Sequence, residues 1–335
     1  MSVNLLSAKR LVGHTPGIPY ANVFNRLDDP LDILFALGDG QSSVALARDP
    51  SLSHPHVFLG GNDQAAFRAG RPLQGYLGWM FSLGRPEWAE EGVAAATLLG
   101  CAVAVGGCAE LLRRRRLNPW LALIILELPG SLAAIRQFGP ELIGLGLAFF
   151  AIACLEDDKV GLAILLFTLA GLARETYLLI PLVYMFFRRD WRLLWPVAAW
   201  LSWSVVPWIR FGAWGPNASP NGSRLITLPF IGLARAFGEM RFAPLSLLLI
   251  AAVPLLVLVC LRKAPADPLT HVVVVYSAFS IFMGQAVWNW WASFSRPLLP
   301  LTACALIVLA ASMARAQTAA QPKEIVIDLT EAPVP

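Results

Sequence analysis

The sequence predicts an all-α polytopic membrane protein with about nine transmembrane helices. Three observations support this fold class. Of the 335 residues, 57% are hydrophobic and only 14% are charged, with a mean hydropathy of +0.61, whereas a soluble domain needs more polar residues to cover its surface. Apolar runs of nearly 20 residues recur along the chain. Basic residues gather in the short segments between these runs, as in the loops of membrane proteins.

The same composition excludes several classes of protein. The formal net charge is only +4, and the basic residues of the chain lie in short clusters between apolar runs, as topology signals do. Nucleic acid is therefore not an expected partner. The five cysteines form no CxxC motif and have no neighbouring histidine pair, which favours packing over disulfides or a cysteine metal site. The chain lacks a Walker sequence and a Rossmann-type glycine motif, so no nucleotide cofactor is expected.

Residues 1–88 precede the first apolar run and are expected to form a first loop on the outer face of the membrane. Within this loop, residues 73–84 (LQGYLGWMFSLG) are too short to span a bilayer. With Tyr76 and Trp79, they suit a helix that lies at the membrane–water interface.

Residues 89–314 are expected to form the transmembrane domain, and residues 315–335 a flexible cytoplasmic tail. Glu127 lies near the middle of the second apolar run, two residues before Pro129, where a kink is expected. The predicted spans are 89–112, 118–135, 140–155, 159–174, 176–188, 193–210, 244–261, 271–288 and 297–314.

Orientation follows from the basic clusters, which include Arg113–Arg116, Arg188–Arg192 and Arg262–Lys263. Cytoplasmic loops carry the excess of Lys and Arg, so these clusters are expected on the cytoplasmic side of the membrane. The intervening loops then lie outside, and the active face is directed outward. An odd number of spans with a cytoplasmic C-terminus leaves the N-terminus outside, so a further span before Met1, giving ten or more, would restore a cytoplasmic start.

Asp39 is the first candidate for chemistry, since Gly38 and Gly40 on either side allow a tight turn that holds the carboxylate outward. A turn aspartate that caps its own loop is the alternative. His54 and His56 follow, and the two could share a divalent ion with Asp39 or belong to a solvated loop. Asp63 is a further acid in the same segment.

Single arginines lie close to membrane-level aromatic residues. Arg68 and Arg71 precede the interfacial helix, where a guanidinium could hold a phosphate or only a lipid headgroup. Arg174 and Glu175 form a charged pair where one span meets the next, and an internal salt bridge between them is the structural alternative. Arg296 opens the last span behind three tryptophans. This pattern suits a substrate with a phosphate head and a lipid tail.

Five motifs carry a resemblance to a known family: GDGQ with ALARDP, FRAGRPLQGYLGWMFSLG, RQFGPEL, LAGLARETYLLIP and WNWWASFSRPLLPL. In this order they resemble the GT-C superfamily of polytopic glycosyltransferases, in particular a bacterial branch assigned to cell-surface glycopolymer formation. The similarity covers roughly residues 36 to 312.

The resemblance implies a donor sugar on a polyprenyl phosphate and an acid in the first outer loop, which is Asp39 here. It implies that Arg71, Arg174 and Arg296 hold the lipid phosphate and that Glu141 faces the same cavity. Supporting positions of the cavity, all drawn from the same motifs, are Gln41, Arg68, Glu141 and Glu175.

The chain departs from the family pattern at two places. Gly38 stands where an aromatic residue usually precedes the acid, and Ser42 and Ser43 follow Gln41 in place of aromatic residues. The family also has a span before the acidic loop, so this chain is expected either to lack a first helix or to be a truncated, inactive relative.

The expected function is therefore an inverting transfer of a sugar from a polyprenyl phosphate to a glycan or lipid acceptor. The carboxylate would act as general base, and the arginines would stabilise the departing phosphate. The need for a divalent metal ion stays open. The alternatives are a non-catalytic flippase or scaffold that binds lipid-linked sugar, and, below it, a polymerase of lipid-linked oligosaccharides.

Overall fold

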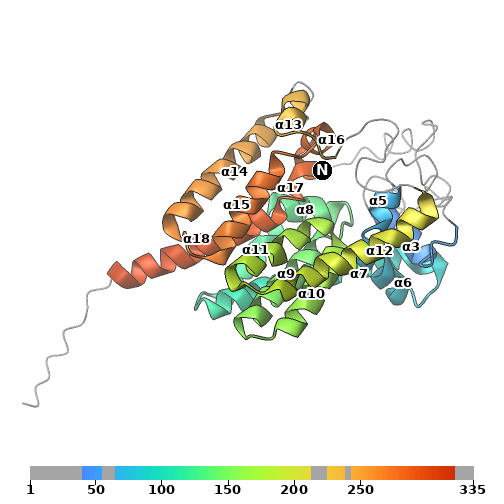
Figure 1. Cartoon of the computed structure of the whole chain (residues 1–335), viewed down its shortest axis with the longest axis horizontal. Coiled ribbons are helices and arrows are strands. Elements are labelled where there is room, and N and C mark those ends of the chain that lie inside the picture. Colours follow the sequence, from blue (N-terminus) through green and yellow to red (C-terminus); the bar gives the residue numbers. More distant parts are fainter. Residues whose placement is uncertain (1–39, 55–64, 213–224, 238–242, 321–335) are drawn as a thin grey trace, which may run out of the picture.

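The computed structural model describes residues 40–54, 65–212, 225–237 and 243–320. Within these ranges every regular element is a helix (Figure 1). The described residues contain no strand, only one isolated antiparallel bridge between Ile226 and Met283. Three of the described helices are long and apolar enough to cross a membrane: α7 (Ala89–Arg114), α14 (Ala243–Lys263) and α18 (Leu299–Ala320). The architecture agrees with the predicted all-α fold and suggests a membrane protein.

The second predicted span is a bent pair. The 3₁₀ helix η2 (Pro119–Glu127) and α8 (Pro129–Arg136) meet at an angle of 63°, so the pair is either one broken span or a re-entrant loop. The bend falls at Pro129, as predicted, because proline has no N–H to continue the helical hydrogen bonds. Glu127 ends η2 and its side chain is exposed.

The other predicted spans correspond to shorter helices. At 1.5 Å per residue, the 14 residues of α10 extend only about 21 Å, less than the roughly 30 Å hydrocarbon core. By length and composition, three or four of the described helices can span, and the count of about nine stays a prediction. The shorter elements are α9 (Glu141–Glu156), α10 (Val160–Ala173), η3 (Glu175–Leu178), α11 (Leu179–Arg188), η4 (Trp191–Leu194), α12 (Trp195–Phe211), α15 (Pro268–Ser280) and α16 (Gln285–Trp288).

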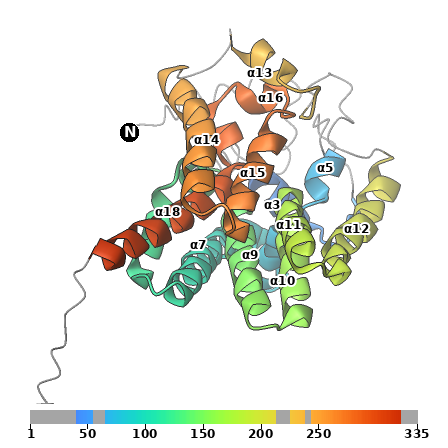
Figure 2. The same ribbon diagram turned by 60° about the vertical axis from the view of Figure 1, so that its left-hand side comes forward.

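The main hydrophobic core surrounds α9, which packs between α7 and α10. Glycines bring α7 and α9 together: a Cβ atom at Gly107 would lie only 2.5 Å from the carbonyl oxygen of Gly146. Figures 1 and 2 both show α14, α15 and α18 side by side next to this group. Helix α11 contacts α15 and so joins the two parts of the core.

The end of the predicted first loop forms a second, smaller core on α7. It comprises α3 (Gly40–Arg48), α5 (Ala65–Ala69) and α6 (Pro72–Phe81), and its apolar contacts include Leu46 and Val93. Helix α6 begins at Pro72, which suits a first helical position. It leaves Trp79 exposed, as expected for an interfacial helix near residues 73–84.

Polar contacts fix α3 in place. Ser43 donates to the side-chain oxygen of Gln74 at 3.3 Å, and the Gln74 amide donates to Thr97 on α7 at 2.9 Å. The backbone N–H of Gly40 donates to the carbonyl oxygen of Gln137 at 2.9 Å. The first turn of α3 therefore lies beside the turn that leads from α8 into α9.

Candidate functional site

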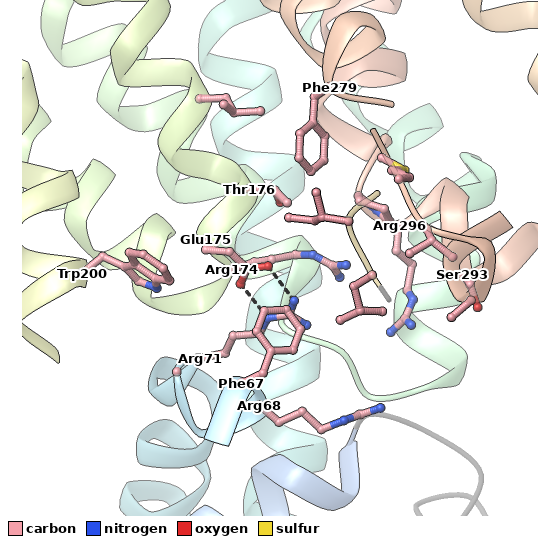
Figure 3. Close-up of a pocket in the computed structure, with 18 of the residues that line it drawn as sticks. Phe67, Arg68, Arg71, Arg174, Glu175, Thr176, Trp200, Phe279, Ser293 and Arg296 are labelled. Atoms are coloured by element: carbon pink, nitrogen blue, oxygen red, sulfur yellow. Dashed lines mark hydrogen bonds and ion pairs between the residues drawn. The ribbon is translucent and has the colours of Figure 1, made fainter. Parts of the chain in front are cut away.

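A cavity of about 450 Å³ lies where the small first-loop core meets the main helical group (Figure 3). Its walls come from the turn between α5 and α6, the break between α10 and η3, the middle of α12, and the segments around α16 and α17 (Trp291–Ser295). Most of the lining is apolar: Phe67, Leu179, Trp200, Pro207, Leu225, Ile226, Phe279, Met283, Ala286, Val287 and Pro297. Arginines occupy one part of this lining.

The break after α10 presents charged residues to the cavity. Helix α10 ends at Ala173, and Arg174 has an extended backbone with φ −158° and ψ 126°. Two tyrosines hold the segment after the break, since Tyr276 donates to the carbonyl oxygen of Thr176 and Tyr177 donates to that of Glu141, both at 2.6 Å. The start of η3 is thereby tied to α15 and to α9.

Arg71 and Glu175, which both line the cavity, form a bidentate ion pair. Nε of Arg71 donates to Oε2 of Glu175 at 2.7 Å and Nη2 donates to Oε1 at 2.6 Å. The Arg71 guanidinium also lies 4.3 Å from the centre of the Phe67 ring. Burial acts to raise the pKa of Glu175, but the adjacent Arg71 charge and hydrogen bonds outweigh it and lower that pKa below its usual value.

Glu141 is the shared counter-ion of two other arginines. Its side chain is fully buried, and Oε1 accepts a hydrogen bond from Nη1 of Arg174 and lies 3.4 Å from Nη1 of Arg296. Nε of Arg296 donates to the carbonyl oxygen of Ala292 at 3.1 Å. Oε2 of Glu141 has no hydrogen-bond partner among the described residues. One carboxylate thus holds two guanidinium groups beside the cavity.

These pairs correct one sequence-based alternative. The sequence pointed to a salt bridge between the chain neighbours Arg174 and Glu175, but the shortest ion pairs cross between distant segments. Arg174 reaches Glu141 and Glu175 reaches Arg71, because the extended backbone at the break separates the two neighbouring side chains. Through these two ion pairs, the break between α10 and η3 is connected to α9 on one side and to the first-loop core on the other.

The structure brings most of the predicted site residues together. Five of them line the cavity, as Figure 3 shows: Arg68, Arg71, Arg174, Glu175 and Arg296. Glu141 forms ion pairs with two of these four arginines, Arg174 and Arg296. The cavity therefore combines guanidinium groups, which are able to bind anions, with apolar walls.

Other predicted site residues are elsewhere or undescribed. Asp39, His56 and the further acid Asp63 lie outside the described residues. Gln41 is buried on α3 and does not line the cavity, although Gly40 next to it contacts Gln137 near Glu141.

His54 lies in the loop after α3, where its Nδ1 is 3.6 Å from Oδ2 of Asp49. Burial acts to raise the pKa of Asp49, but hydrogen bonds from the backbone N–H groups of His54 and Ser53 and from the Ser51 hydroxyl outweigh it, so this pKa is lowered. Within the described ranges, no three His, Cys, Asp or Glu residues gather as a metal site would require.

Sequence reasoning did not single out Phe67, Thr176 or Trp200, which also line the cavity. Thr176 follows the Arg174–Glu175 pair and could have been found from that motif. Trp200 is one of several tryptophans in a span where an aromatic belt is expected, so its residue type alone carried no signal.

No protein-family model, no curated protein and no solved structure matches this chain. The chemistry of the cavity is therefore the main basis for a function.

Proposed function

We propose that the protein is a membrane glycosyltransferase that uses a polyprenyl-phosphate sugar as donor and a glycan or lipid as acceptor. The observation that supports this proposal best is the cavity with four arginines on one part of its lining and apolar side chains on the rest. The resemblance of the sequence motifs to the GT-C superfamily points to the same substrate class.

Each part of the cavity suits one part of such a donor. A departing polyprenyl phosphate gains negative charge, which preorganised guanidinium groups stabilise, and a planar guanidinium matches two phosphate oxygens at once. The apolar walls, with Phe279 and Met283 among them, suit the first isoprene units. A bidentate partner for Arg71 already exists in Glu175, so a phosphate would replace or join that carboxylate.

In the proposed reaction, an acceptor hydroxyl attacks the anomeric carbon as the bond to the phosphate oxygen breaks. Asp39 takes the hydroxyl proton, and the lipid phosphate leaves with the bonding electrons, so the configuration inverts. Asp39, alone or with His54 and His56 around a divalent ion, belongs to this proposal through the family resemblance and through the position of Gly40 beside Gln137.

The proposed topology has the cavity at the outer face of a bacterial inner membrane, with about nine spans. Cysteine labelling in intact cells should therefore place Arg113–Arg116 and residue 335 in the cytoplasm and Asn217–Arg224 outside. Labelling of Asn217–Arg224 only after the cytoplasmic side is exposed would contradict the orientation and the proposed access of donor to the cavity.

The arginines provide the direct test of donor binding. Arg71→Ala should weaken binding of a polyprenyl-phosphate sugar by about 10- to 100-fold, because a hydrogen bond to a charged group contributes roughly 1.5–3 kcal/mol. Arg71→Lys should rescue poorly because an ammonium cannot supply a planar fork. Arg296→Ala should have an effect in the same range. Binding to purified protein in nanodiscs is the measurement.

Arg85→Ala is the matched control, because the Arg85 guanidinium also stacks on an aromatic ring, at 4.5 Å from the centre of Trp88, but lies outside the cavity lining. It should bind the donor as the parent does. If Arg71→Ala and Arg296→Ala keep full affinity while Arg174→Ala misfolds, the arginines are structural and the proposed function loses its support.

A further inference from the structure

Two buried polar atoms on uncharged side chains of the cavity lining have no hydrogen-bond partner among the described residues. They are the hydroxyl oxygen of Thr176 and the indole nitrogen of Trp200. Buried polar groups in proteins are nearly always paired, and an unpaired one needs an explanation such as an absent ligand. Both atoms belong to residues that face the same cavity, so one ligand could pair them.

Thr176 differs from four other hydroxyl residues of the described helices. Thr97, Thr168, Ser204 and Ser312 each donate to the carbonyl oxygen four residues earlier, at 2.8–3.0 Å. Thr176 follows the extended residue Arg174, so no regular helical turn precedes it to supply such a carbonyl. Its residue is only 8% exposed, and its backbone oxygen is fixed by Tyr276.

Trp200 differs in the same way from other tryptophans. The indole N–H of Trp203 donates to the carbonyl oxygen of Ala69, and that of Trp288 donates to Met283, both at 3.1 Å. The indole nitrogen of Trp200 is buried without such a carbonyl. Figure 3 shows Trp200 and Arg296 on opposite sides of the Arg71–Glu175 pair, with Thr176 above the pair.

We propose that Thr176 and Trp200 recognise the hydroxyl groups of the donor sugar, an inference that rests on the proposed function. The threonine hydroxyl can both donate and accept, and the indole N–H can only donate. A sugar hydroxyl can satisfy both groups, since it also donates and accepts. An isoprene chain can form a hydrogen bond with neither group, and the arginines are the proposed partners of the phosphate. The two residues therefore distinguish a glycosylated lipid phosphate from the bare lipid phosphate.

The test compares two kinds of lipid with the same short polyprenyl chain. One is the bare polyprenyl phosphate, and the other is a panel of polyprenyl phosphates that carry glucose, mannose, galactose or N-acetylglucosamine. Calorimetry on the full-length protein in nanodiscs gives each dissociation constant. The parent should bind at least one glycosylated lipid more tightly than the bare phosphate.

Trp200→Phe keeps the aromatic ring and removes only the N–H, and Thr176→Val keeps the shape and removes the hydroxyl. Each change should weaken binding of the preferred glycosylated lipid by about 3- to 10-fold, the range expected for one hydrogen bond. Binding of the bare lipid phosphate should change by less than about twofold. Thr176→Ser retains the hydroxyl and should keep the sugar preference.

Trp203→Phe and Thr168→Val are the matched controls, because they remove an N–H and a hydroxyl that already have protein partners. They should leave the preference for the glycosylated lipid unchanged. An equal loss for both lipids in Trp200→Phe and Thr176→Val, or no loss in Trp200→Phe, would overturn the inference.

The design also separates this inference from the proposed function. If the parent binds the bare and glycosylated lipids equally well, sugar recognition is refuted while phosphate binding stands. If the parent binds none of these lipids, the proposed function itself fails, and the inference fails with it.

Discussion

Asp39→Asn should abolish sugar transfer, with a loss of about 10²- to 10⁴-fold or more in rate, while expression and donor binding stay nearly intact. Asparagine keeps the size and the hydrogen bonding of a turn residue but cannot accept a proton from the attacking hydroxyl. Asp39→Glu should retain little activity, because a shift of the carboxylate by roughly 1 Å can cost about 10²-fold. The measurement is glycosidic bond formation by reconstituted protein, with donor binding measured in parallel.

Asp49→Asn is the control from the same part of the chain. The Asp49 carboxylate accepts hydrogen bonds from Ser51, Ser53 and His54, which makes it a structural acid of the loop after α3. This variant should lose some stability and keep transfer. If Asp39→Asn transfers sugar as fast as the parent, Asp39 is only a turn residue, and the base must be sought at Asp63, Glu141 or Glu127.

The structure describes two of these three alternatives. Asp63 lies outside the described residues, and Glu127 is exposed at the end of η2. Glu141 is the one of the three that is seen beside the cavity arginines, but its carboxylate is engaged by Arg174. In a flippase or scaffold, by contrast, the parent would bind or move lipid-linked sugar without forming any glycosidic bond, and the Asp39 variants would do the same.

Glu141→Ala should lower the free energy of unfolding by roughly 3–5 kcal/mol, since removing one partner of a buried ion pair leaves an uncompensated buried charge. Here Arg174 and Arg296 would lose the carboxylate that they share and would face each other as like charges. Denaturant unfolding of the purified protein measures the change. Glu91→Gln, at an exposed position in the first turn of α7, is the control and should change stability by about 1 kcal/mol or less.

A double-mutant cycle with Arg174→Ala separates pairing from packing. If Glu141 acts mainly as counter-ion, the double variant should be less destabilised than the sum of the two single variants, by about 0.5–3 kcal/mol. Additive losses would show that Glu141 contributes by packing alone. The role of Glu141 as counter-ion of Arg174 would then be refuted.

The helices were predictable because their signals are local. Each predicted span corresponds to helical structure in the described residues, and the break at Arg174 and the bend at Pro129 lie where charge and proline predicted them. The number of membrane crossings was not predictable, since short apolar helices such as α10 give the same composition signal whether or not they reach both surfaces.

The partners within the site were not predictable in the same way. Arg71 and Glu175 are 104 residues apart in the chain, and Glu141 and Arg174 are 33 apart, so only the packed fold decides these pairs. The sequence indicated the arginines through their cost in apolar surroundings. It could not indicate Trp200, whose missing partner is visible only once the carbonyl groups around it are placed.

The two separate hydrophobic cores have a consequence for motion. Arg68 and Arg71 come from the small core of α3, α5 and α6, whereas Arg174 and Arg296 come from the main core. Helix α7 contributes residues to both cores, yet separate hydrophobic clusters can open as separate cooperative units. The bidentate ion pair between Arg71 and Glu175 therefore links the two cores. A phosphate that competes for Arg71 would weaken this link. Amide hydrogen exchange in α6 would then quicken on binding while exchange in α9 stayed slow.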